Sequence, residues 1–300
     1  MCALHGLDIG NHHEVLVPAL GFAAAAEAVI RVGATPVFVD VEPTTLGPDP
    51  SACAMARTPR TAAIIVMHLF GQAVDLDAVA SALPNTPMIG DAAQAIGTLW
   101  RGQHVGTIGT VGAFSFFPAK SLGAAGDAGA VSTSDTDLAD RMRQARAHGS
   151  STAYEWNGPG GNYRMDALQA SLLTVKLGAL EHRLHRRRSM GNTMRDLLLS
   201  HDVSVLCGTS RCVPTYAPFA IRTKQRDRFL GMLRSRGIDA RVHYPSTLSS
   251  APAFHSYARS TAYPNAEQAT AELLSLPCSP ELHDDEFTRL LTTMDEVFRG

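Results

Sequence analysis

The chain has 300 residues, of which 45% are hydrophobic, and its 26 basic residues nearly balance its 28 acidic ones. This length exceeds one simple compact domain, and the near-neutral charge excludes an overall field that would draw nucleic acid or an anionic membrane to the protein. No apolar run is long enough to span a bilayer, and the first residues do not resemble a secretory signal. The five cysteines lack the spacing of a disulfide scaffold, so we expect a cytoplasmic protein with a small polar ligand.

Short β-branched runs alternate with helical patterns of small residues through the first half of the chain. Strands are expected at 15–17, 36–41, 62–67, 87–89, 111–116 and 129–133, and helices at 22–32, 75–83 and 135–148. This alternation predicts an α/β fold, with a mostly parallel sheet sandwiched by helices. Ligands of such sheets bind at the carboxyl ends of the strands.

The second half begins with a glycine-rich interval at 149–161, followed by a long broken helix at 164–199. A strand at 218–221, a helix at 225–236, a strand at 240–243 and two further helices then predict a smaller α+β unit. We therefore expect a large α/β domain over 1–175, and a bridging helix with a small C-terminal domain over 176–300.

One dense basic run lies within the expected broken helix. A solvated helix face is the favoured interpretation and an anion-binding patch is the alternative, because the run is short and lacks interleaved aromatic residues. The run consists of His182, Arg183, His185, Arg186, Arg187 and Arg188.

Lys120 is one of only three lysines, and it lies among aromatic and small residues in the sequence 114–129. A buried ammonium loses its hydration, so its pKa falls towards that of a neutral amine, the form that makes a Schiff base. The alternative is a lysine that extends from a loop into solvent, and this one feature supports both interpretations equally.

Two further polar residues are expected at strand ends. Asp91 follows a buried strand, where a carboxylate can hold a protonated pyridine nitrogen, although a helix N-cap is the simpler interpretation of this residue alone. Ser115 lies on the strand that leads to Lys120, where its hydroxyl can donate to a phosphate or bond to the backbone. Glycines 123, 126 and 129 permit a tight turn or a backbone that approaches a phosphate.

No metal site is predicted. The run His12-His13-Glu14 has the spacing of no common metal site, and Cys207 and Cys212 lack a CxxC pair. Hydrolase and nucleoside-triphosphatase motifs are also absent from the sequence.

These residues fall within a series of ordered motifs, through which the sequence resembles the DegT/StrS family of sugar aminotransferases. That family is a branch of the fold-type I pyridoxal-phosphate enzymes, and the resemblance covers nearly the whole chain. The motifs lie at 13–22, 33–40, 67–72, 91–94, 114–120, 148–149, 161–169, 236–238 and 243–245.

The resemblance implies a role for each residue of a pyridoxal 5'-phosphate site. Lys120 matches the lysine that joins the cofactor and moves the proton, Asp91 the partner of the pyridine nitrogen, and Ser115 a phosphate ligand. Phe22 matches the aromatic residue that stacks on the ring, and Gln94 a polar neighbour of the cofactor's oxygen.

Family members are homodimers with shared active sites, and Asn162 matches a residue that reaches the phosphate of the other subunit's cofactor. His243 and Tyr244 fall near the family's substrate pocket. The implied reaction moves an amino group from L-glutamate to a keto nucleotide-sugar, in amino-sugar biosynthesis for a polysaccharide or a secondary metabolite. Relatives that dehydrate sugars have histidine in place of the lysine, so Lys120 favours the aminotransferase branch.

The chain departs from the family pattern at several points. The family's Ser-Gly-Thr turn, which supplies phosphate ligands, is expected just before Met1. Gly21, Gly90 and Ser121 stand where relatives usually have threonine, an acidic residue and asparagine. Two alternatives therefore stay open: a truncated homologue with a binding or regulatory role, and an aminotransferase for a cyclitol.

Overall fold

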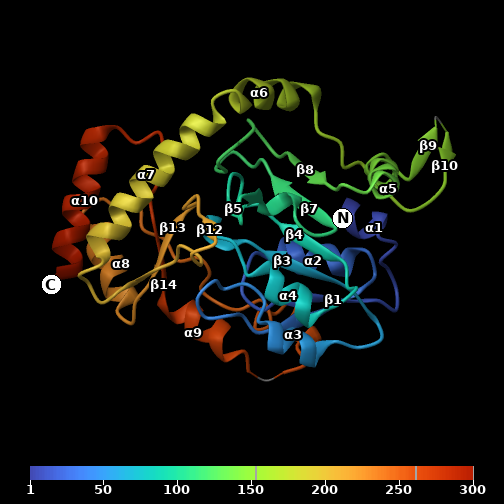
Figure 1. Ribbon diagram of the computed structural model, residues 1–300, viewed down its shortest axis with the longest axis horizontal. Helices are drawn as coiled ribbons and strands as arrows, with labels where there is room; N and C mark the ends of the chain where they lie inside the picture. Colours follow the sequence, from blue (N-terminus) through green and yellow to red (C-terminus); the bar gives the residue numbers. More distant parts are fainter. Residues whose placement is uncertain (153, 261, 300) are drawn as a thin grey trace.

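The computed structural model describes residues 1–152, 154–260 and 262–299, and it confirms the α/β class (Figure 1). A six-stranded sheet in the order β2-β1-β3-β4-β7-β8 forms the centre of the first half. Neighbouring strands are parallel except for β8, which runs antiparallel to β7. The strands are β1 (Glu14–Pro18), β2 (Thr35–Val39), β3 (Thr61–Met67), β4 (Met88–Asp91), β7 (Val111–Ser115) and β8 (Gly129–Ser132), close to their predicted ranges.

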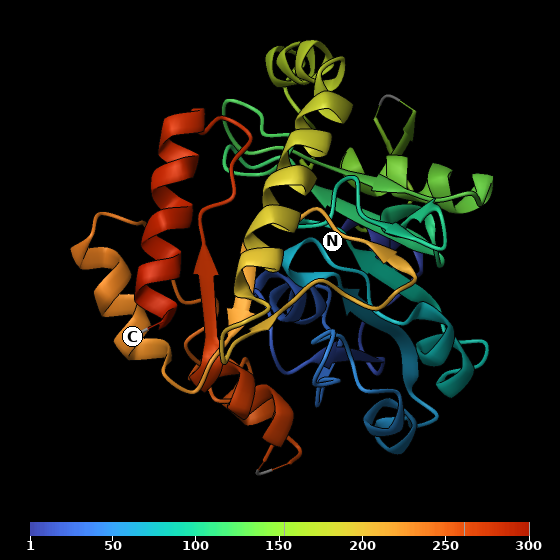
Figure 2. The same ribbon diagram turned by 60° about the vertical axis from the view of Figure 1, so that its left-hand side comes forward.

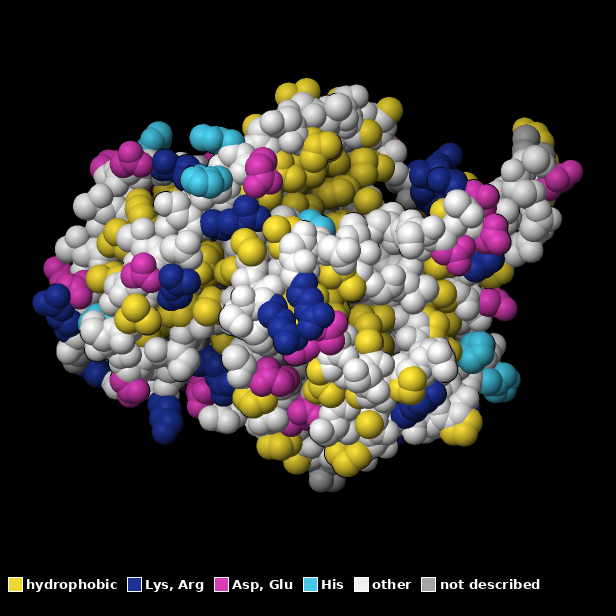
Figure 3. Space-filling model, in the orientation of Figure 1, with side chains coloured by type: hydrophobic (Ala, Val, Ile, Leu, Met, Phe, Trp, Pro, Cys, Tyr) yellow, Lys and Arg dark blue, Asp and Glu magenta, His cyan; other side chains and the backbone are white. Residues whose placement is uncertain are grey.

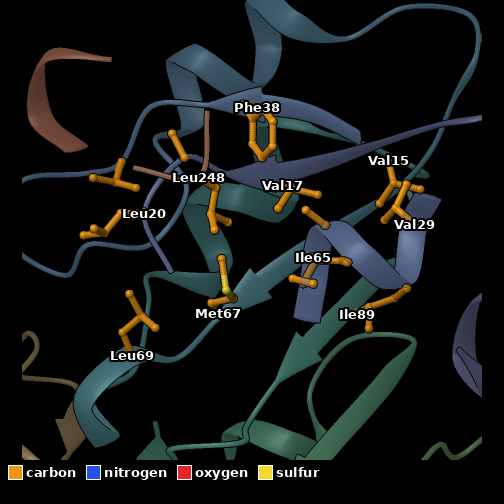
Figure 4. Packing of buried hydrophobic residues seen from close by; sticks show 14 of the residues in the cluster. Val15, Val17, Leu20, Val29, Phe38, Ile65, Met67, Leu69, Ile89 and Leu248 are labelled. Carbon is orange, nitrogen blue, oxygen red and sulfur yellow. The ribbon is translucent and has the colours of Figure 1, made fainter. Parts of the chain in front are cut away.

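Helices cover both faces of this sheet, as predicted. Side chains alternate between the two faces along a strand, so Val15 and Val17 lie in one core and Leu16 lies in the other. Figure 4 shows part of the first core, where Leu248 from the C-terminal third packs with the sheet. The first core contains residues of α1 (Cys2–Gly6), α2 (Ala24–Arg31) and α5 (Thr136–Arg146), and the second contains residues of α3 (Pro50–Ala56) and α4 (Leu76–Ala82).

Aspartates begin three of these helices. The side chain of Asp49 accepts a hydrogen bond of 2.7 Å from the main-chain N–H of Ala52 and so caps α3. Asp75 and Asp135 cap α4 and α5 in the same way. Each cap satisfies a helix N–H that has no partner within the helix. Helix α3 was not predicted, although Asp49 followed by proline is a typical helix start.

The predicted long helix is two helices, α6 (Ala167–Leu177) and α7 (Leu180–Leu198). Figure 2 shows α7 beside α10 (Asp284–Arg299), next to a small antiparallel sheet in the order β11-β13-β14. Apolar residues of α7, α8 and α10 form a core with this sheet. The remaining parts are α8 (Arg226–Ser235), β11 (Ser204–Val205), β13 (Phe219–Arg222) and β14 (Leu273–Leu276).

The strand predicted at 240–243 is wrong. Arg241 makes only an isolated bridge to Ser275, with backbone hydrogen bonds of 2.9 and 2.8 Å. The unpredicted strand β14 pairs with β13 instead, along all four residues of each strand. The segment around Arg241 therefore lies at the far edge of β14, and it turns away after one residue pair.

Helix α9 (Pro264–Glu272) packs into the first core, although it lies beyond residue 175. The division of the chain into domains at that point stays a prediction.

Within the described ranges, no helix is both long and apolar enough to cross a membrane. Figure 3 shows hydrophobic side chains gathered around α6 and in the recess below it. Short elements complete the fold: η1 (Leu69–Gly71), β5 (Leu99–Trp100), β6 (Gln103–His104), η2 (Val105–Thr107), β9 (Ser150–Thr152), β10 (Glu155–Trp156), β12 (Cys212–Val213) and η3 (His255–Tyr257).

Candidate active site

A cavity of about 1100 Å³ lies at the carboxyl ends of β3, β4 and β7. Parallel sheets bind ligands at this edge, so the position agrees with the sequence-based expectation. Segments 241–244 and 276–279 of the C-terminal third form the opposite wall. Seven of the eight residues proposed from the sequence line the cavity, namely Phe22, Asp91, Gln94, Ser115, Lys120, His243 and Tyr244.

Asp91 is the last residue of β4, between β3 and β7 in the middle of the sheet. One carboxylate oxygen accepts a hydrogen bond of 2.9 Å from the N–H of Ala93. Burial raises the pKa of Asp91, while this hydrogen bond and the charge of Lys120 lower it. The helix N-cap interpretation of Asp91 is wrong, because residues 92–98 form turns and no helix begins there.

Lys120 lies on the connection between β7 and β8, and its side chain lines the cavity rather than extending into solvent. Burial lowers the pKa of the Lys120 amine, and the charge of Asp91 opposes this effect by raising it. A lysine in such surroundings holds its neutral form at lower pH than an exposed lysine does. The structure therefore favours the buried-amine interpretation over the solvated one.

A tight turn places Lys120. Its main-chain N–H donates to the carbonyl of Phe117 over 2.9 Å, and Ala124 donates to Phe116 over 2.7 Å. Gly123 makes this turn possible, since a Cβ there would lie 2.3 Å from the carbonyl oxygen of Pro118. Close backbone packing thus requires the glycine, and the tight turn that it permits was one of the two uses expected for it.

Gln94 connects the two walls of the cavity. Its side-chain oxygen accepts from the N–H of Phe70 over 2.8 Å, and its amide nitrogen donates to the Tyr244 hydroxyl over 3.0 Å. Burial raises the pKa of Tyr244 to about 12, so the hydroxyl keeps its proton at neutral pH. The Tyr244 proton is then available to a ligand as a hydrogen-bond donor.

His243 stands beside Tyr244 with its ring oriented by a neighbouring strand. Its Nδ1 lies 2.9 Å from the Ser275 hydroxyl on β14. Burial and the positive charges of Arg241 and Lys120 lower the pKa of His243. The imidazole is therefore predominantly neutral at neutral pH.

Ser115 and Phe22 lie at other points of the cavity. Ser115 ends β7, and its hydroxyl oxygen accepts a bond of 3.3 Å from the N–H of Phe117, which leaves the hydroxyl proton for a ligand. The Phe22 ring is 62% exposed, with its centroid 6.4 Å from that of Tyr244. The ring thus has exposed surface beside the cavity, on which a flat ligand can stack.

Asn162 is the one proposed residue that does not line the cavity. Asn162 is exposed, and its main chain forms an isolated antiparallel β-bridge with Ala147. Its side-chain oxygen accepts a hydrogen bond of 2.9 Å from Arg164. Tyr163 and Arg164, its neighbours in the sequence, do line the cavity.

Arg187 is a cavity residue that the sequence analysis named only as part of the basic run, for which a solvated face was favoured. Its side chain is only 9% exposed, so the solvated-face interpretation of the basic run is wrong at this position. The spacing of α7 contained the signal, because Arg187 belongs to the stripe of buried residues that includes Leu184, Gly191 and Met194.

His68 is a second cavity residue that was not predicted. It is buried, and its Nε2 has no hydrogen-bond partner among the described residues. Burial lowers the pKa of His68 to about 3, so the ring is neutral. A Cβ at Gly90 would lie 3.6 Å from this nitrogen, so an acidic residue at that position would place its carboxylate near His68.

Comparison with known proteins places the whole arrangement in one family. Residues 1–295 match the model of the DegT/DnrJ/EryC1/StrS aminotransferase family. A pleiotropic regulatory protein of Geobacillus stearothermophilus is 38% identical over 99% of this chain and 82% of its own length. A UDP-N-acetyl-3-dehydro-α-D-glucosamine 3-aminotransferase of Acidithiobacillus ferrooxidans is 37% identical over 100% of this chain and 82% of its own.

The fold is equally close to solved structures. The crystal structure of S. venezuelae DesV in complex with a ketimine intermediate superposes with a TM-score of 0.94 and 35% identity, over 98% of this chain and 81% of the other. Sequence and structure thus agree over nearly the whole chain. The protein belongs to the DegT/DnrJ/EryC1/StrS aminotransferase family, an aminotransferase family of the pyridoxal-phosphate-dependent class.

Proposed function

We propose that the chain is a pyridoxal-phosphate-dependent transaminase that moves an amino group from L-glutamate to a keto nucleotide-sugar in amino-sugar biosynthesis. The observation that carries this proposal is the placement of the Lys120 amine and the Asp91 carboxylate in one cavity, each acting on the pKa of the other. The relative from A. ferrooxidans supports the acceptor, because its name specifies a UDP-linked 3-dehydro sugar. When bound, pyridoxal phosphate supplies a carbonyl group for the amine and a ring that accepts electrons.

The residues present fit this cofactor. Within the described ranges, the Asp91 carboxylate has one hydrogen-bond partner, so its second oxygen is available to a cation such as a protonated pyridine nitrogen. Pairing with such a cation offsets the cost of burying the carboxylate. The free hydroxyl proton of Ser115 would bind phosphate, and the exposed ring of Phe22 would cover the face of the pyridine. A cavity of about 1100 Å³ holds the cofactor and a sugar together.

Lys120 would accept and return the proton that moves in the reaction. Its lowered pKa makes the neutral amine available to take a proton, and the charge of Asp91 stabilises the ammonium that then forms. The turn through Phe117 fixes the backbone from which the amine acts. Tyr244, held by Gln94, and neutral His243 would bind polar atoms of the substrate from the opposite wall.

We also propose a homodimer with shared active sites. Asn162 lies outside its own cavity and is exposed, which is compatible with contact to the cofactor of a second subunit. Exposed apolar side chains gather on the neighbouring helix α6, and contiguous surfaces of this kind mark protein interfaces (Figure 3). They are Leu168, Leu172, Val175 and Leu177.

Three finer points remain proposals. The division into a large domain over 1–175 and a smaller one over 176–300 is supported by the separate core of α7, α8, α10 and the small sheet. The cytoplasm is proposed as the location because the cysteine pattern is that of reduced thiols. A cyclitol would be an alternative acceptor for the same cavity.

A binding or regulatory role is the second candidate function. The relative from G. stearothermophilus, named as a pleiotropic regulatory protein, favours it. The paired Lys120 and Asp91 favour catalysis instead, because titratable groups that shift each other's pKa within a cavity cluster at active sites.

Absorption spectroscopy of the purified chain separates these candidates. We expect added pyridoxal phosphate to give a visible band, L-glutamate to bleach it, and a keto nucleotide-sugar to restore it. A Lys120→Ala variant should give no such band, whereas Lys224→Ala, at an exposed position, should behave as the parent. Transamination by Lys120→Ala would refute the proposed role of the lysine.

A further inference from the structure

We propose that Arg187 forms an anion subsite that binds a carboxylate of the amino donor; this inference rests on the proposed function. Arg187 is the most buried residue of the basic run on α7, with 9% exposure. Within the described ranges, the one hydrogen-bond partner of its guanidinium is the neutral hydroxyl of Ser121, at 3.1 Å from Nη1. A guanidinium has five N–H groups, so most of its donors are left for a ligand.

The neighbouring arginines on α7 are paired differently. Arg183 forms an ion pair with Glu281, and Arg186 forms one with Asp284 at 2.9 Å. Arg188 pairs with Glu181 and also donates to the carbonyl of Gly97. These three are more exposed than Arg187 and yet have carboxylate partners.

Arg187 is thus the buried arginine that makes no ion pair within the described part of the chain, and it points into the cavity. Burial lowers the pKa of Arg187, while the charge of Glu281, which is paired with Arg183, raises it; the arginine stays protonated. Burying a cation that has no carboxylate in direct contact is costly, and a bound anion offsets that cost.

The surroundings of Arg187 suit a short, partly apolar anion. Ser121 lines the cavity with it, and its hydroxyl accepts from Arg187 and so keeps its proton for a ligand, whereas the hydroxyl of Ser279, also in the cavity wall, donates to Glu281. Pro218, Pro277 and Leu276 contribute apolar wall. A planar guanidinium can bind both oxygens of a carboxylate at once, and the apolar wall accommodates methylene groups.

The connection of Arg187 to the lysine segment favours a carboxylate over the diphosphate of a nucleotide-sugar. Arg187 bonds to Ser121, the residue that directly follows Lys120 in the chain, and Arg187, Ser121 and Lys120 line the same cavity. The carboxylates of an amino acid are only a few bonds from its nitrogen, whereas a sugar ring separates a diphosphate from the ketone. Arg241 and Arg164 also line the cavity, and both are exposed, which suits contact with the outer diphosphate.

The test measures binding of glutarate, a dicarboxylate of glutamate's length without an amino group. Isothermal titration calorimetry would use the chain saturated with pyridoxal phosphate, comparing Arg187→Gln with the parent. We expect glutarate affinity to fall about 10- to 100-fold, the loss typical of hydrogen bonds to a charged group. Affinity for uridine diphosphate should change less than about 3-fold, because that ligand does not use Arg187. Arg186→Gln is the matched control, since Arg186 lies on the same helix outside the cavity and should leave both affinities unchanged.

Arg187→Lys keeps the charge but loses the planar guanidinium, so it should bind glutarate with an affinity between those of the parent and Arg187→Gln. If Arg187→Gln does not fold, the glutarate affinity of Arg187→Lys tests the proposal in its place. Equal glutarate affinity in the parent and in Arg187→Gln, or no binding by the parent, would overturn the proposal. Loss of uridine diphosphate affinity alone would assign Arg187 to phosphate and also overturn it. Glutarate cannot be transaminated, so this result is independent of whether the chain turns over substrates.

Discussion

Gly123→Ala tests whether the turn around Lys120 sets its catalytic position. The backbone of Gly123 is not in the left-handed region, so the substitution acts only through the steric clash of the added Cβ. The added Cβ would lie 2.3 Å from the carbonyl oxygen of Pro118, against the 3.0 Å that real Cβ contacts require, so the turn must shift by at least about 0.7 Å (3.0 − 2.3). A misplacement of about 1 Å in an active site costs about 100-fold in rate, so we expect a loss of that order in kcat.

The assay is transamination by variants saturated with pyridoxal phosphate, together with the visible spectrum and the melting temperature. Gly126→Ala is the matched control in the same loop, because its Cβ would lie 3.0 Å from the end of the flexible Gln169 side chain. We expect the control to keep activity within about 3-fold, since that side chain can move. A Gly123→Ala protein with the parent's kcat and spectrum would show that the close packing at Pro118 does not position the lysine.

Three more predictions address charge and hydrogen bonding. Glu14→Gln should destabilise the fold by about 2 kcal/mol in urea unfolding near pH 7, because the buried carboxylate accepts charged bonds from partly exposed Arg259. Burial raises the pKa of Glu14, but its arginine and threonine partners lower it below the usual 4.5. The contribution of Glu14 to the free energy of unfolding is therefore present above pH 4.5 and is lost as the pH falls through the folded-state pKa. A Glu14→Gln variant whose stability depends on acid pH as the parent's does would contradict this. Asp91→Asn removes a charge that raises the pKa of Lys120, so acetylation of that lysine in the cofactor-free chain, mapped by mass spectrometry, should begin at lower pH than in the parent. Tyr244→Phe should raise the KM for the substrates about 10-fold, and an unchanged KM would exclude the hydroxyl from binding.

The parallel sheet and the edge that carries the candidate site could be predicted because their signals are local. Strands such as β1 are buried on both faces and read as continuous apolar runs, so their ranges follow from the sequence. Parallel strands also end at a common edge, so the expected ends of β4 and β7 already bring Asp91 and Ser115 together. The burial of Lys120 could not be derived in this way, since it depends on the walls that later segments add.

Long-range packing accounts for the errors. The segment at 240–243 has strand-like residues, but its pairing was decided by β14, which takes the edge of β13. Asp91 has the sequence of a helix cap, yet the following residues turn because Gln94 bonds to the N–H of Phe70 in another segment. Propensity is a weak prior in such places, and tertiary contacts override it.

The side chain of Gln94 links the two walls of the cavity through its hydrogen bonds. Phe70 holds its main chain in the left-handed region, with φ of 60°, which is unfavourable for a residue with a side chain. Gln94 compensates by accepting from the Phe70 N–H, and the same amide donates to Tyr244, 150 residues later. Because Gln94 follows Asp91 by three residues, the turn that presents the carboxylate also fixes the tyrosine on the opposite wall. Gln94 therefore helps to set the spacing between the residue proposed for the cofactor and the residue proposed for the substrate, together with the packing of Leu248 in the first core.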